Sequence, residues 1–142
     1  MTNKEKRAAL VAKIKSREGK NQYTQSSKRD QVSSGYSDCS SLQQWVYEQV
    51  LDVNIGDNTE AQMLSKQLTT IDAGISGGVP DEDKLLLGDL LYFRGTDPDR
   101  KATGYVGHVE MYVGNGELSG CHWIEESGLL TTPIALTNTH SL

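Results

Sequence analysis

The apolar pattern of this chain changes period near its middle, and that change limits the folds open to it. Residues 42, 45, 46, 49 and 50 follow the pattern i, i+3, i+4, i+7 and i+8, and all except Gln49 are apolar, which predicts an amphipathic helix that Gly56 closes. The same spacing over 4–14 predicts an earlier helix that ends near Gly19. Potential capping residues precede 60–68, where we expect a short third helix.

The second half of the chain has the character of strands. Residues 90–93 and 108–113 are apolar runs of strand length, and Gly114-Asn115-Gly116 is a strong hairpin signal before a returning strand over 117–123. Helices first and antiparallel strands second predict an α+β fold, with residues 1–142 forming one domain. The last stretch, 121–142, shows only short apolar patches and predicts no clear strand.

Charge and composition exclude several classes of function. The net charge is -5, which argues against nucleic-acid binding because phosphate neutralisation needs a basic face. No apolar run approaches the roughly 20 residues of a membrane span, and the charged residues 1–20 show no secretory signal. Two cysteines are too few for a disulfide framework, and no ligand cluster implies a metal. We expect a monomer without a cofactor.

Cys39 and His108 are the residues with the clearest chemical potential. Cys39 stands where a polar loop meets the second predicted helix, so the unpaired N–H groups of the first turn would favour its thiolate. His108 opens a strand after Gly107, and an imidazole there could exchange a proton with a thiol. Taken alone, each has an ordinary alternative, a buried small cysteine or a surface histidine.

Four segments in order resemble the successive motifs of NlpC/P60 peptidases. They are Tyr23, then YSDCSSL at 36–42, then GDLLYF at 88–93, then GHVEMYVGNG at 107–116. The resemblance covers roughly residues 4 to 118. It implies a compact papain-like fold, and an enzyme that cleaves peptidoglycan stem peptides after γ-D-glutamate.

The resemblance also implies roles for individual residues. Cys39 would attack the scissile carbonyl, and His108 would take the thiol proton and later hand it to the leaving amine. Asp38 and Ser40 match positions that help to recognise the free amino group and main chain of the substrate. Tyr23 matches an aromatic residue near the active site, although it reads equally well as a half-buried tyrosine.

The sequence departs from the family at the third polar residue, which orients the base. Counting along the motif places it at Gly120, which has no side chain to offer. His122 is the alternative. A three-residue hairpin loop would bring His108 opposite His122, with both side chains on one face of the sheet. A two-residue loop would shift the register and turn His122 to the other face. This departure predicts weak activity.

Three functions remain open at this point. A peptidoglycan endopeptidase is the main prediction. The same Cys–His pair could instead serve an amidase or acyltransferase on another substrate, because a fold does not determine a function. A catalytically impaired wall-binding domain is the third. Without a visible signal, we expect synthesis in the cytoplasm and delivery to the wall at phage or prophage lysis, as for an endolysin.

Overall fold

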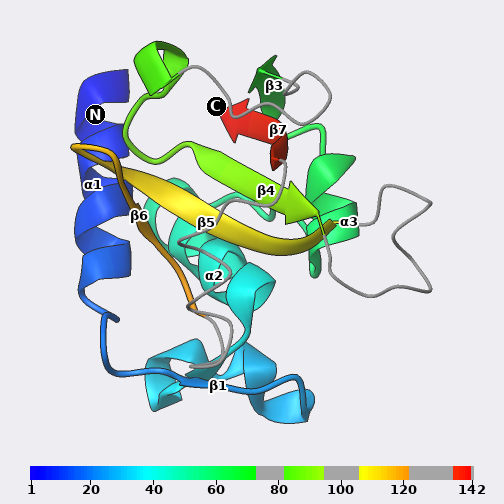
Figure 1. Cartoon of the computed structure of the whole chain (residues 1–142). Helices are drawn as coiled ribbons and strands as arrows, with labels where there is room; N and C mark the ends of the chain where they lie inside the picture. The colour runs from blue at the N-terminus through cyan, green and yellow to red at the C-terminus, as the bar shows by residue number, and fades with distance from the viewer. Residues whose placement is uncertain (73–81, 95–105, 122–135, 142) are drawn as a thin grey trace.

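The computed structural model describes residues 1–72, 82–94, 106–121 and 136–141 (Figure 1). Its α-helices are α1 (Asn3–Lys15), α2 (Cys39–Leu51) and α3 (Thr59–Met63), with short 3-10 helices η1 (Ser27–Asp30), η2 (Val32–Ser34) and η3 (Glu82–Lys84). Its strands are β1 (Gln22–Tyr23), β2 (Tyr36–Ser37), β3 (Thr69–Asp72), β4 (Leu90–Arg94), β5 (Val106–Gly114), β6 (Glu117–Ser119) and β7 (Leu136–Ser141). The predicted α+β class is confirmed.

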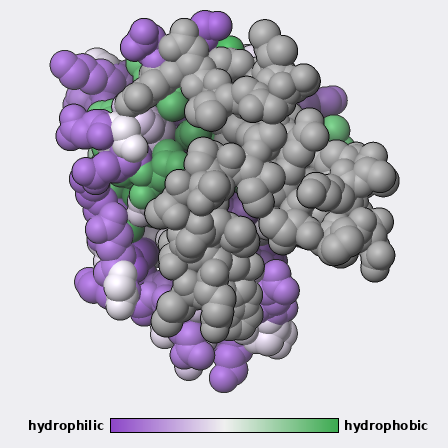
Figure 2. Space-filling model, in the orientation of Figure 1, coloured by the Kyte–Doolittle hydropathy of each residue, from purple (hydrophilic) through white to green (hydrophobic). Residues whose placement is uncertain are grey.

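One antiparallel sheet forms the C-terminal part of the fold. Its strands run in the order β3-β7-β4-β5-β6, and each neighbouring pair is antiparallel. Helices α1 and α2 pack against it, and apolar side chains from both helices and from β4 and β5 share one core. Hydrophilic side chains cover the outer side of α1, at the left of the molecule (Figure 2). The N-terminal helices therefore support the sheet, as the sequence predicts.

The helices form where the periodicity predicts them, but their ends differ. Helix α2 stops at Leu51, because Asp52 adopts the left-handed conformation at φ 56° and caps the helix in place of Gly56. Helix α1 stops at Lys15 with Ser16 as its cap, and Gly19 serves the following turn at φ 71°. The third helix ends at Met63 and is shorter than predicted, because Leu64 caps it by donating its N–H to the carbonyls of Ala61 and Gln62.

The β5–β6 hairpin combines both predicted registers. Its loop is the two residues Asn115 and Gly116, both at positive φ, and Gly114 pairs with Glu117. A bulge at Val113 then adds one residue to β5, so that Met111 pairs with Ser119. Beyond the bulge the strands therefore follow the register of the three-residue alternative. His122 itself lies outside the described residues.

The expectation that the C-terminal segment forms no clear strand is wrong. Residues 121–142 predict no clear strand, yet β7 lies inside the sheet between β3 and β4. Leu91 of β4 faces Thr139 of β7, and Thr70 of β3 faces His140 on its other side. Strands β3 and β7 are rich in polar residues with no simple alternation, so their pairing comes from distant parts of the chain and not from a local pattern.

Candidate active site

Cys39 is the first residue of α2, and a tightly built helix start holds it. Asp38 caps the helix: its Oδ1 accepts a hydrogen bond of 2.8 Å from the N–H of Ser41, and the Ser41 hydroxyl accepts one of 2.9 Å from the N–H of Asp38. Such reciprocal bonds fix the first turn. The side chain of Cys39 is buried at 5% exposure, at the positive end of the helix dipole.

Arg29 anchors this helix start from the neighbouring segment. Its Nε lies 2.6 Å from Asp38 Oδ2, and its Nη2 donates to Asp38 Oδ1 at 3.1 Å. The guanidinium also donates to the hydroxyl of Ser40 and to the carbonyl of Asp57. Burial would raise the pKa of Asp38, but its bonds to Arg29 and Ser41 outweigh burial and lower it. Asp38 is therefore ionised at neutral pH.

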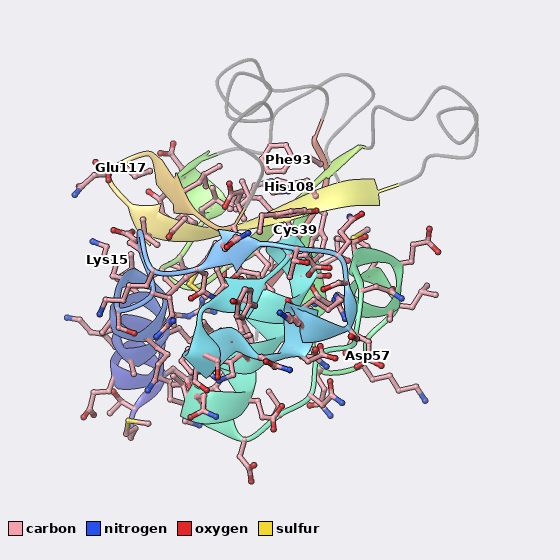
Figure 3. The ribbon with its side chains drawn as sticks, turned by 90° about the horizontal axis from the view of Figure 1, so that it is seen from below. Lys15, Cys39, Asp57, Phe93, His108 and Glu117 are labelled. Carbon is pink, nitrogen blue, oxygen red and sulfur yellow. The ribbon has the colours of Figure 1, made fainter. Side chains whose placement is uncertain are left out.

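His108 lies next to Cys39 from strand β5 (Figure 3). The thiol Sγ of Cys39 is 4.0 Å from the carbonyl oxygen of Gly107, the residue before His108. The imidazole also packs beside Phe93, with ring centroids 6.1 Å apart. Phe93 and His108 are register partners on β4 and β5, so the sheet itself determines where the imidazole stands.

The surroundings of His108 favour its protonated form. Burial would lower the pKa of the imidazole, but interactions with the Cys39 side chain and the Glu110 carboxyl group outweigh burial and raise the pKa to about 10. The imidazolium is thus the stable form at neutral pH. A thiol and an imidazole in this relationship can exchange one proton.

Glu110 is a site residue that the sequence analysis missed. Its Oε1 lies 3.3 Å from Nε2 of His108, and the side chain is buried at 3% exposure. His108 and Glu110 stand two residues apart on β5, alternating with the buried Val109 and Met111, so both project from the same face. The glutamate at His+2 was the available signal, because a charged residue within an apolar strand is rarely buried without a partner.

The other predicted site residues lie around the start of α2 in different settings. Ser40 is buried, and its hydroxyl donates to Asp38 Oδ1 at 3.2 Å. Tyr23 is 9% exposed on β1, where its hydroxyl accepts a hydrogen bond from Gln25, and β1 pairs with β2 directly before Asp38. The structure thus brings Tyr23, Asp38 and Ser40 to one end of α2, and their contact with a substrate stays a prediction.

Two further buried residues, Cys121 and Asp89, make structural contacts. Cys121 is a free, buried cysteine whose Sγ is 3.6 Å from the carbonyl of Ser37, and burial raises the pKa of its thiol. Asp89 closes a turn by accepting from the N–H of Leu86 at 2.9 Å, and it pairs with Arg7 of α1 at 2.7 Å. Cys121 thus contacts strand β2, directly before Asp38, and Asp89 links the start of β4 to α1.

In the described ranges, no three His, Cys, Asp or Glu side chains gather where they could hold a metal ion. Nor is any helix of this part of the chain both long and apolar enough to cross a membrane.

The fold and the site together define the class of protein. A cysteine at the start of a helix, beside a histidine on an antiparallel sheet, is the arrangement of papain-like thiol hydrolases. The model of the NlpC/P60 family matches residues 18–123. The chain belongs to the NlpC/P60 family. A search of the curated proteins found no match to it.

Solved structures share the fold at low sequence identity. NlpC2 of Trichomonas vaginalis is 22% identical with a TM-score of 0.67, and the alignment covers 94% of this chain and 45% of that one. NlpC1 of Trichomonas vaginalis is 23% identical with a TM-score of 0.70, covering 100% of this chain and 46% of that one. The NlpC/P60 domain of the peptidoglycan hydrolase SagA is 23% identical with a TM-score of 0.58, covering 93% and 86%. The chain thus spans less than half the length of the two Trichomonas proteins.

Proposed function

We propose that this protein is a cysteine peptidase that hydrolyses peptidoglycan stem peptides, with Cys39 as the nucleophile and His108 as the base. The observation that carries the proposal is the position of Cys39 at the start of α2, beside the imidazole of His108. Membership of the NlpC/P60 family supports a cell-wall peptidase or amidase. The shared fold of the domain from the peptidoglycan hydrolase SagA is consistent with this choice.

The reaction follows from the proton that Cys39 and His108 share. His108 takes the thiol proton, and the thiolate of Cys39 attacks the scissile carbonyl to give a tetrahedral oxyanion. Collapse of this intermediate breaks the C–N bond, and the imidazolium of His108 protonates the leaving amine. Water, deprotonated by His108, then hydrolyses the thioester and restores the thiol. The contacts that raise the pKa of His108 favour the imidazolium beside the Cys39 thiolate, which is the form from which the attack begins.

The start of α2 would also stabilise the oxyanion. The N–H groups in the first turn of a helix have no partner within the helix, so they can stabilise a negative charge that develops at the N-terminal end. The N–H of Cys39 belongs to this turn. Donors held in place before the reaction stabilise an oxyanion without reorganisation, and each is worth roughly 10²–10³ in kcat.

The proposed bond is the one after γ-D-glutamate in the stem peptide. Tyr23, Asp38 and Ser40 would bind the adjoining part of the substrate. The oxygens of Asp38 already accept from Arg29, Ser40 and Ser41, so a substrate amine would meet the Arg29–Asp38 pair and not a bare carboxylate. We propose that the protein reaches the wall by release at phage or prophage lysis, and this proposal is independent of the chemistry.

A digest of purified muropeptides, followed by mass spectrometry, tests the proposed function. New fragments ending in γ-D-glutamate with the wild type, and none with Cys39→Ser, would establish both the bond and the nucleophile. Cleavage or acyl transfer elsewhere that also needs Cys39 would make the protein an amidase or acyltransferase. No product with either protein would refute the enzyme and leave a wall-binding domain.

A further inference from the structure

We propose that Glu110 is the residue that orients His108, and that Gly120 is a glycine because the Glu110 carboxyl group fills the space of its missing side chain. This inference rests on the proposed function of His108, and it adds a positioning residue that comes from the same strand as the base. Its evidence is the geometry of three neighbouring residues: His108, Glu110 and Gly120.

The first observation is the space beside Gly120. A Cβ atom built on Gly120 would lie 1.6 Å from Oε2 of Glu110 and 2.5 Å from its Cδ. The three atoms nearest to that Cβ all belong to the Glu110 carboxyl group. The register of the hairpin agrees, because Met111 pairs with Ser119 and the next pair along would be Glu110 with Gly120. Any side chain at residue 120 would displace the carboxylate.

The second observation is where that carboxylate points. Its Oε1 is 3.3 Å from Nε2 of His108, and the Glu110 side chain is 3% exposed. A family member would place a polar side chain from residue 120 beside the base. Here residue 120 supplies only room, and the polar group reaches the imidazole from β5. The room at Gly120 and the carboxylate of Glu110 are therefore complementary.

This contact has a definite chemical consequence. A carboxylate beside Nε2 keeps the proton on that nitrogen and leaves Nδ1 to exchange a proton with the thiol of Cys39. It also stabilises the imidazolium that forms when Cys39 loses its proton. The raised pKa of His108, to which Glu110 contributes, agrees with this effect. A buried Glu110 thus favours the thiolate–imidazolium form of the Cys39–His108 pair.

The test measures this form without relying on the wall substrate. The rate at which iodoacetamide, a neutral reagent, alkylates Cys39 reports the thiolate as a function of pH, and Cys121→Ala removes the second thiol from the background. We expect Glu110→Gln to slow alkylation roughly tenfold near pH 7 and to shift the pH profile of alkylation to higher pH. The reason is that the imidazolium loses the carboxylate that stabilises it, and a shift of one pKa unit is a factor of ten. Glu117→Gln is the matched control, since Glu117 is exposed and lies away from Cys39 (Figure 3).

Gly120 provides a second, independent variant. Gly120→Ala should displace the Glu110 carboxylate from His108 and reproduce the slower alkylation. The double variant Glu110→Gln/Gly120→Ala should be alkylated little more slowly than Glu110→Gln alone. Such non-additivity is expected of two residues that act through one contact. The double variant Glu110→Ala/Gly120→His restores a polar group from the β6 side, and it should recover part of the rate. If Glu110→Gln fails to fold, the alkylation rate of this double variant, compared with that of the wild type, tests the inference in its place.

The outcomes separate the inference from the proposed function. Slower alkylation in Glu110→Gln and Gly120→Ala, together with an unchanged profile in Glu117→Gln, supports the inference even if no muropeptide is cut. A wild-type profile in Glu110→Gln overturns it. So does a profile that shifts in His122→Ala but not in Glu110→Gln, because the orienting role would then belong to His122.

Discussion

Arg29 Nε lies 2.6 Å from Oδ2 of Asp38, the residue that caps the helix carrying Cys39. One carboxyl group therefore serves two purposes, since it caps the start of α2 and binds the guanidinium of Arg29 from η1. The contact joins two segments that local sequence patterns treat separately, and it makes the position of Cys39 depend on both.

Asp38→Ala should lower the free energy of unfolding by roughly 2 to 4 kcal/mol, because it removes a helix cap and leaves a largely buried guanidinium without its main anion. Asp30→Ala is the matched control. Asp30 also contacts Arg29, at 3.3 Å, but its side chain is 69% exposed, so its loss should cost less than about 1 kcal/mol. Urea unfolding measures both. Equal effects of the two substitutions would contradict the structural role of Asp38.

His108 should contribute to stability in a pH-dependent manner. Its pKa is raised from 6.5 to about 10 in the folded protein, so between these values the folded state holds a proton that the unfolded state has lost. The stabilisation is fully present below pH 6.5 and disappears as the pH rises through 10. The unfolding free energy of the wild type relative to His108→Gln should therefore fall over that window, as measured by urea unfolding at both ends. An imidazole that titrates near 6.5 by NMR would contradict this account.

Gln62 is expected to be the most sensitive buried amide behind the site. It donates to the carbonyls of Ser40 and Gly56, at 3.0 and 3.1 Å, and accepts a hydrogen bond of 3.0 Å from the hydroxyl of Tyr92. Gln62→Ala should destabilise the fold by roughly 3 kcal/mol, because the two carbonyls and the Tyr92 hydroxyl would lose their hydrogen bonds to the Gln62 amide. Gln67→Ala, at an exposed position, should have little effect. Thermal unfolding of the two variants compares them, and similar melting temperatures would argue against the network.

Strand β7 gives a prediction about the C-terminal segment. Thr139 faces Leu91 on one side and Asp72 on the other, so its strand lies inside the sheet. Thr139→Pro should lower stability by roughly 3 kcal/mol or more, because proline removes a ladder donor and is excluded from central strands. Urea unfolding provides the measurement. An unchanged midpoint would mean that β7 contributes little to the sheet.

Local patterns were sufficient for part of this fold. The periodicity around Leu42 and Val46 predicts α2, because those residues face the core. The apolar run at 90–93 predicts β4, which is buried in the sheet. These elements are encoded by neighbouring residues, and so was the position of Cys39 at a helix start.

The remaining features depend on contacts between distant residues. Strands β3 and β7 have no distinctive pattern, and only their pairing makes them strands. The bulge at Val113 decides the register of the hairpin, which sequence spacing left open between two loop lengths. Glu110 was missed for a related reason, since its place beside His108 and Gly120 follows from strand faces that become visible only once the sheet is built.

The central claim is that Cys39 is the nucleophile, and the most direct measurement compares the two free cysteines. We would measure kcat/KM for muropeptide cleavage by the wild type, Cys39→Ala and Cys121→Ala. Both cysteines are buried, so each substitution changes the packing to a similar degree. We predict that Cys39→Ala loses on the order of 10³-fold or more in kcat/KM, as expected for a missing nucleophile, while Cys121→Ala retains most of it. Cleavage by Cys39→Ala at the rate of the wild type would contradict the account.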